Sequence, residues 1–486
     1  MAQKREEQSL LGRSTEPSII SSRNNSTEPV KLTPSWEARN DLQEDELNFR
    51  SLTMDRVKME MQPPSDRFKI IFFILLFHGI GTLTPWNMFI TAKEYFVDYK
   101  LSPNYTGTNN TEYAANFMPY LTFASQIPNV LFNWMNIFVN LGGDLTKRVV
   151  WSLIIEIILF LITVILAMVD SSQWPGTFFW VTMASVVVLN MFGGIFQNTV
   201  YGMAAKLPSK YTGAVVLGSN ISGTFATVIS IMSGFIWSSV RKAAIYYFIT
   251  AMFVILICFD TFFAMPLNRF FRYHEMQSEK AQEKSRRSNI IGSGKPPYWT
   301  IFKQSSLQLF NVFMIFFVTL SVFPTVHSDI KPTSEEDMFG IISNKFFTPI
   351  TCFLTFNVFA MLGSLTTSWV QWPSPKFLVW PVLLRIAFIP LFLMCNYHPL
   401  GVTRVLPVYI KNDYLYWSIA VLMSFSSGYL SSLAMMYAPR SQTNPVYQVK
   451  AGMMAAAMLI SGIFGGIMFS FLPPIIVQYN FENLFS

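Results

Sequence analysis

The stretch that decides the fold class runs from residue 148 to residue 169 and reads RVVWSLIIEIILFLITVILAMV. After the arginine at its start, its only ionisable residue is Glu156. A helix needs about 20 predominantly apolar residues to cross about 30 Å of hydrocarbon. A run of this length and composition would be insoluble on a water-facing surface. The sequence therefore predicts a helix that spans a membrane.

Similar apolar stretches recur along the chain, which has 486 residues, 51% of them hydrophobic and 13% charged. A soluble domain carries about 25% charged residues. We therefore expect an all-α integral membrane protein with about eleven transmembrane helices. The expected spans are 69–91, 116–140, 148–169, 178–205, 211–237, 243–266, 300–324, 346–370, 377–395, 413–437 and 451–477.

The segments outside these spans suggest how the chain is organised. Residues 1–66, rich in Ser, Glu, Arg and Pro, predict a disordered cytosolic tail. A basic cytosolic loop at 267–299 separates an N-terminal six-helix bundle, 67–266, from a C-terminal five-helix bundle, 300–478. A short tail, 479–486, then lies outside. Two bundles around a central path are typical of transporters.

The distribution of charge gives the orientation. Lys and Arg gather in the tail and in the loops on its side of the membrane, above all in 267–299, which places the N-terminus in the cytosol. An odd number of helices then puts the C-terminus on the extracellular or luminal side. The glycosylation sequons at Asn104 and Asn109 fall in the first outside loop, and we expect them to carry glycan. The net charge of +7 follows this membrane pattern, so nucleic acid is not an expected partner.

Neutral polar side chains form stripes along three expected helices. Their spacing of three and four residues places each set on one helical face. Such amides either hydrogen-bond between helices or line a water-filled path. A path lined by amides and aromatic rings suits a flat, uncharged solute with hydrogen-bonding groups. The sets are Gln126, Asn129, Asn133, Asn136 and Asn140; Asn190, Gly194, Gln197 and Tyr201; and Phe353, Asn357, Ala360 and Ser364.

Ionisable groups inside the expected spans are few. Glu156, Asp260, Arg385 and His78 are each either structural or part of a functional relay. The three cysteines have no metal-ligand spacing, and no catalytic constellation or phosphate-binding loop is present. We therefore expect neither an enzyme nor a cofactor or metal.

Residues 81–92, GTLTPWNMFITA, resemble the first-helix signature of the equilibrative nucleoside transporter family. Further similarities follow in order, at 202–205 (GMAA), 353–357 (FLTFN) and 427–430 (SGYL). The resemblance extends over about residues 67 to 470. It implies a major-facilitator-like bundle of six plus five helices that carries nucleosides such as adenosine and uridine by alternating access, without ion coupling.

The resemblance also implies which residues serve the substrate. Leu83 and Trp86 match lining positions of the first helix, and Gln197 matches a glutamine that contacts the nucleoside. Gln126 and Asn129 occupy lining positions that are usually apolar in the family. The remaining implied substrate residues are Phe323, Phe353 and Asn357. Three glycines match family positions that serve folding or transport, namely Gly193, Gly218 and Gly223. Arg385 also matches an arginine of the family.

The eighth helix departs from the family, which usually has an Asp and an Arg one turn apart where this chain has Ala360 and Ser364. This departure leaves open a carrier of nucleobases or organic cations, and a channel is a further alternative. The plasma membrane is the expected location. Glu6 followed by Leu10 and Leu11 also matches a signal read by sorting adaptors, which leaves an endosomal or lysosomal membrane as the alternative.

Overall fold

The computed structural model describes residues 63–92, 94–107, 112–139, 145–237, 239–289, 297–333, 347–399 and 403–478. The expectations for Asn109, Asn140, the Glu6–Leu11 signal and the 479–486 tail lie outside these residues. Residues from Pro63 onward form one compact unit. Its regular structure in the described part is helical, which agrees with the expected fold class.

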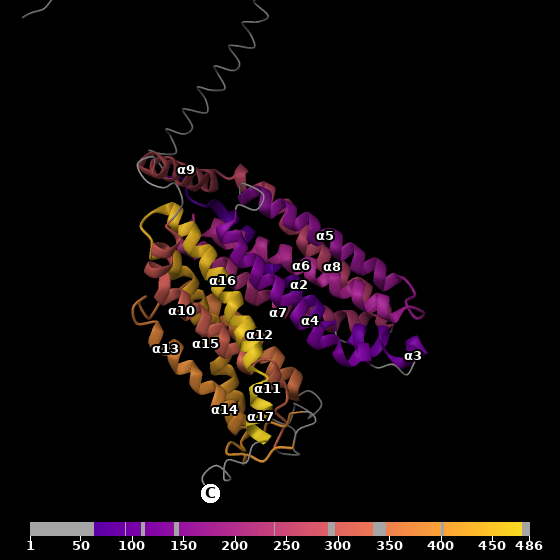
Figure 1. Cartoon of the computed structure of the whole chain (residues 1–486). Coiled ribbons are helices and arrows are strands. Elements are labelled where there is room, and N and C mark those ends of the chain that lie inside the picture. Colours follow the sequence, from indigo (N-terminus) through magenta and orange to yellow (C-terminus); the bar gives the residue numbers. More distant parts are fainter. Residues whose placement is uncertain are drawn as a thin grey trace, which may run out of the picture. The chain divides into compact units, whose positions relative to one another are not determined.

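The first half of the unit supplies six long helices where six spans were expected (Figure 1). Five of them are long and apolar enough to cross a membrane. The exception is α4, because its amides lower its mean hydropathy. The six helices are α2 (Ile70–Thr91), α4 (Glu112–Phe138), α5 (Leu145–Met168), α6 (Pro175–Ala204), α7 (Ser209–Ile236) and α8 (Val240–Ala264).

The second half supplies three helices of membrane-spanning length and composition, and two shorter apolar segments. The long ones are α10 (Tyr298–Val322), α15 (Asp413–Arg440) and α16 (Pro445–Phe469). The expected span 346–370 is divided into η5 (Pro349–Leu354), with wide π-type turns, and α12 (Thr355–Thr366). Eight described helices therefore qualify as spans by length and composition, and the count of eleven stays a prediction.

Prolines divide two other expected spans. The span 377–395 consists of α13 (Val379–Leu384), a 3₁₀ turn η6 (Arg385–Ala387) and α14 (Phe388–Met394). Within 451–477, α16 ends at Phe469 and α17 (Leu472–Gln478) follows. Proline lacks the N–H that would continue a helix, and its ring collides with the preceding turn. Pro390 and the Pro473–Pro474 pair therefore explain the interruptions.

Two structural features lie at or between the expected domain boundaries, which stay predictions. Asp66, placed at the end of the disordered tail, accepts hydrogen bonds from the backbone N–H groups of Ile71 and Phe72, both at 3.2 Å, and from Tyr211 Oη at 3.0 Å. These bonds satisfy donors at the start of α2, so ordered structure begins before residue 67. The basic loop 267–299 contains a helix, α9 (Arg269–Asn289), which packs against α16.

Glycines set the distance between α2 and α7. A Cβ on Gly218 would overlap the Leu76 carbonyl, and one on Gly79 would overlap the Val215 carbonyl. The two backbones can lie this close only because both positions lack a side chain. Across the two halves, α16 packs against α4 and α6, while α15 packs against α7. These contacts bring the polar faces of α2, α4 and α6 beside α16.

Candidate functional site

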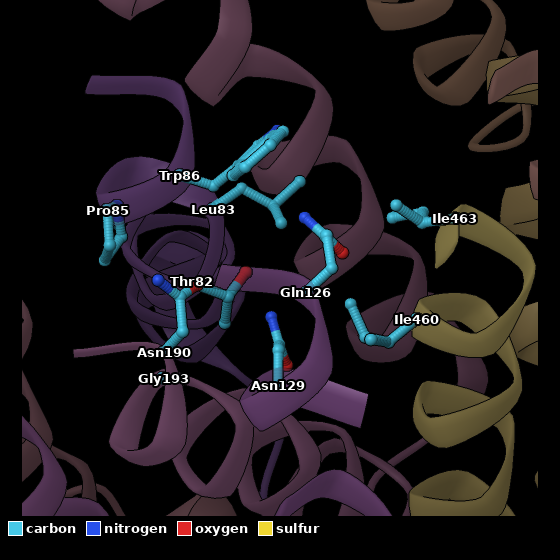
Figure 2. A pocket seen from close by; sticks show the side chains of 10 residues that line it. All are labelled: Thr82, Leu83, Pro85, Trp86, Gln126, Asn129, Asn190, Gly193, Ile460 and Ile463. Carbon is cyan, nitrogen blue, oxygen red and sulfur yellow. The ribbon is translucent and has the colours of Figure 1, made fainter. Parts of the chain in front are cut away.

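A small cavity lies where α2, α4 and α6 meet α16 (Figure 2). Three helices of the first half supply its polar wall, and the second half supplies an apolar wall. Its lining residues are Thr82, Leu83, Pro85 and Trp86 from α2, Gln126 and Asn129 from α4, Asn190 and Gly193 from α6, and Ile460 and Ile463 from α16.

Proline and threonine shape the α2 wall. Pro85 lies inside α2 and cannot donate to the preceding turn. Thr84 Oγ1 donates to the Ile80 carbonyl at 2.8 Å, and Thr82 Oγ1 donates to the Gly79 carbonyl at 2.7 Å. Both hydroxyls thus bond to carbonyls in the turn before Pro85, the turn that leads to Leu83 and Trp86. Figure 2 shows the Leu83 side chain extending toward Gln126, with the Trp86 ring beside Leu83.

The amides of α4 divide into two groups. Gln126 and Asn129 line the cavity. Asn129 Oδ1 accepts a hydrogen bond from Asn133 Nδ2 at 2.8 Å. Gln126 Oε1 is buried without a partner among the described residues. A buried acceptor without a partner is costly, so this oxygen is suited to receive a donor from a bound solute.

Asn136 belongs to a structural network instead. Its Nδ2 donates to Asn198 Oδ1 at 3.0 Å, and Asn198 Nδ2 donates to the Met453 carbonyl at 2.7 Å. Arg148 Nη1 donates to Asn136 Oδ1 at 2.9 Å. The network joins α4, α5, α6 and α16, so this end of the stripe connects helices and does not line the cavity.

Gln197 is buried one turn beyond Gly193 on α6, outside the cavity wall. Its Nε2 has no partner among the described residues, so it retains an unused donor close to the cavity.

Three predicted residues of the second half form a separate group. The ring centroids of Phe323 and Phe353 are 5.9 Å apart, and Phe356 stacks on Phe323 at 3.8 Å. Asn357 Nδ2 donates to the Phe353 carbonyl at 3.0 Å. A Cβ on Gly223 would overlap Asn357 Oδ1, which places this amide directly against α7. None of these residues lines the cavity in this conformation.

Ala360 and Ser364, the two positions on α12 that depart from the family pattern, lie at a helix–helix contact. Ser364 Oγ accepts from Asn220 Nδ2 at 2.6 Å and donates to the Gly428 carbonyl at 3.1 Å. Ala360 is buried, and a Cβ on Gly428 would overlap its carbonyl. Both positions therefore pack between α7 and α15.

Arg385 connects α10 and α15. Its guanidinium donates to Thr319 Oγ1 at 2.7 Å, to the Met423 carbonyl at 3.0 Å and to Ser426 Oγ. It is 2% exposed. These contacts are those of a structural residue.

The cavity is neutral and narrow. None of its ten lining side chains carries a charge, which suits an uncharged solute. Its volume of about 20 Å³ accommodates roughly one water molecule. A solute with a sugar and a base can enter only when the walls separate.

The sequence pattern did not single out Thr82, Pro85, Ile460 and Ile463, and it placed Asn190 on a polar face without assigning it to the substrate. Thr82 and Pro85 lie within the 81–92 signature, and Asn190 lies on the polar face of α6, so a signal existed for these three. Ile460 and Ile463 belong to an apolar helix, and only the packing of the two halves identifies them.

The comparisons with known proteins decide the family. A family model described as "Nucleoside transporter" matches residues 183–474. Human equilibrative nucleoside transporter 1 is 31% identical over 454 residues, covering 84% of this chain and 98% of that protein. Human equilibrative nucleoside transporter 2 is 32% identical over 461 residues, with the same coverage.

The chain belongs to the equilibrative nucleoside transporter family. Solved structures support the fold of this transporter. The proton:xylose symporter XylE, of the major facilitator superfamily, aligns with a TM-score of 0.54 at 11% identity, covering 87% of this chain and 90% of that one. The human organic anion transporter MFSD10 aligns with a TM-score of 0.50 at 12% identity, covering 85% of this chain and 96% of that one. The fold is therefore similar to that of these two structures.

Proposed function

We propose that this transporter carries nucleosides across a membrane down their gradient, by alternating access and without ion coupling. The observation that carries the proposal is the neutral cavity shared by the two halves, which is lined by an indole and by a glutamine with an unpaired acceptor. The family relationship supports the same function.

The lining side chains match a nucleoside in kind. The Trp86 ring offers a surface on which a base can stack. Gln126 Oε1 can accept a hydrogen bond from a base or ribose donor, and Asn129 offers a second amide. Leu83 and Ile463 exclude water from the apolar parts of the solute.

Alternating access requires the α16 wall to move relative to α2, α4 and α6. We propose that this movement widens the cavity and brings Gln197 Nε2 into contact with the solute. Phe323, Phe353 and Asn357 would then complete the site from the second half. This assignment rests on the unused donor of Gln197 and on the proximity of Asn357 to α7.

The test is uptake of radiolabelled adenosine and uridine into proteoliposomes that contain the purified transporter. We expect saturable uptake that is unchanged when sodium or proton gradients are dissipated, and that is stimulated by nucleoside on the opposite side. Non-saturable flux without trans-stimulation would contradict the proposal and favour a channel. Competition by adenine or by a monoamine at concentrations where uridine does not compete would favour the nucleobase or organic-cation alternatives.

We also propose a cytosolic N-terminus, an extracellular or luminal C-terminus and residence in the plasma membrane. The loop charges support this topology.

A further inference from the structure

Directly behind the cavity wall lies a carboxyl group that the proposed function does not use. Glu156, on α5, is fully buried, and neither of its oxygens has a hydrogen-bond partner among the described residues. A Cβ on Gly193 would lie 3.6 Å from Glu156 Oε1. Gly193 lines the cavity. Gly193, which has no side chain, therefore adjoins both this carboxyl and the candidate nucleoside site.

Among the described residues, no counter-charge lies against Glu156: the cations of its own helix, Lys147 and Arg148, lie two turns away, and Arg148 donates to Asn136. Glu156 lies on α5, which packs against α6 and α8. The titratable group that α8 presents to it is the Cys258 thiol, which donates to the Phe77 carbonyl at 3.3 Å. On α6 the one titratable residue is Tyr201, two turns beyond Gly193. On α2, the His78 ring lies against Phe196 and Phe262, with both nitrogens unpaired among the described residues.

A carboxylate without donors or a counter-ion is strongly disfavoured in such an environment, so the group is held there as the neutral acid. Ionisation requires water to reach the group. Because Gly193 both lines the cavity and adjoins Glu156, water that enters a widened cavity has a short route to the carboxyl. Conformations in which the cavity wall at Gly193 is closed and dry therefore favour the protonated form of Glu156.

We propose that Glu156 is a proton-binding site that sets the pH range of transport, with the protonated acid as the form that completes the transport cycle. The ionised form holds the carrier in conformations that hydrate the carboxylate, and it slows the return to the closed conformation. The effect requires no proton gradient, because the proton modulates the carrier and is not a transported co-substrate. The inference rests on the proposed function for its uptake measurement.

The experiment measures initial adenosine uptake into proteoliposomes with equal pH on both sides, from about pH 5.5 to about pH 9, a range that includes the titration of buried carboxyls. Adenosine does not change its charge in this range. We expect wild-type uptake to be at least about threefold faster at the acidic end than at the alkaline end. Glu156→Gln and Glu156→Leu, both permanently neutral, should keep the acidic-end rate over the whole range.

Asp260→Asn is the matched control, because Asp260 is an exposed carboxyl on the neighbouring helix α8, and its variant should keep the wild-type pH profile. His78→Gln should keep it as well. A wild-type profile without pH dependence, or one that is unchanged in both Glu156 variants, would overturn the proposal. Loss of the pH dependence in His78→Gln alone would assign the proton site to His78 and would equally overturn it.

A second readout does not depend on transport. The melting temperature of the detergent-solubilised protein should fall between acidic and alkaline pH in the wild type and fall less in Glu156→Gln. The sign follows because a group that is neutral when buried stabilises the fold while protonated and loses this contribution as pH rises. Parallel melting profiles would contradict the proton site even if adenosine were not transported. If adenosine were not taken up but the melting profiles of the wild type and Glu156→Gln diverged, the proposed function would be contradicted and the proton site would stand.

Discussion

At the residue scale, a polar side chain either forms hydrogen bonds with neighbouring helices or remains unpaired at the cavity, depending on which partners lie within reach. Asn129, Asn133 and Asn136 lie on one face of α4, yet the structure uses Asn136 for helix contacts and leaves Gln126 with an unpaired acceptor at the cavity. The helical period places all of them on one face. It does not distinguish a network from a binding wall.

Trp86 provides the first prediction. Trp86→Ala removes the ring on which a base would stack, and we expect nucleoside transport efficiency to fall about tenfold or more, as for a loss of roughly 1–3 kcal/mol. Initial uptake rates at matched protein levels measure the effect. Trp380→Ala is the control, because Trp380 is 68% exposed on α13, away from the cavity. Equal uptake in the two variants would remove Trp86 from the site.

Gln126 provides the second. Gln126→Leu keeps the approximate volume but removes the acceptor, so we expect a loss in transport efficiency of about tenfold, because a bound donor is left unpaired. The fold should tolerate the change, since Gln126 Oε1 has no partner among the described residues. A full set of KM and Vmax values for adenosine and uridine separates binding from turnover. Unchanged values for both substrates would exclude a direct contact.

At the element scale, glycines decide how closely helices approach. Gly193 and Gly218 look alike in the sequence, but a Cβ at Gly218 would overlap the Leu76 carbonyl, whereas one at Gly193 would lie at ordinary contact distance, 3.6 Å, from Glu156 Oε1. The first glycine is therefore required for packing between α2 and α7. The second has room beside it and borders the cavity.

A third prediction follows from this contrast. Gly218→Ala should destabilise the protein by about 1–3 kcal/mol or more, because the backbone of α2 cannot yield as a flexible side chain can. Gly193→Ala should fold normally and alter transport only. Melting temperature and surface expression of both variants provide the measurement. Equal stability of the two variants would show that the α2–α7 contact tolerates a side chain.

At the scale of the whole molecule, a fourth prediction concerns topology. Asn104 is exposed in α3 (Pro103–Thr106), in the loop that the charge distribution places outside. We expect glycan at Asn104, at Asn109 or at both, so enzymatic deglycosylation should increase the mobility of the wild type. The Asn104→Gln/Asn109→Gln variant should already run at the deglycosylated position. A wild type without a shift would leave the proposed orientation unsupported, and a shift in the double variant would reveal a further glycosylation site.

The sequence by itself determined that the protein is helical, lies in a membrane, belongs to this transporter family and carries polar faces on α4, on α6 and on the segment that contains η5 and α12. It could do so because hydropathy, helical period and a local signature such as 81–92 are properties of consecutive residues. It also placed Leu83, Trp86, Gln126, Asn129 and Gly193 among the candidate residues, and these five are among the ten that line the cavity.

Only the tertiary structure decided which side chains of a polar face form hydrogen bonds with other helices. It also showed that Ile460 and Ile463 close the cavity from the second half. It also placed Glu156 behind Gly193 and placed Ala360 and Ser364 between α7 and α15. These facts depend on contacts between residues far apart in the chain. Whether a buried polar atom finds a partner is determined by which helices pack around it, and the spacing along one helix does not contain that information.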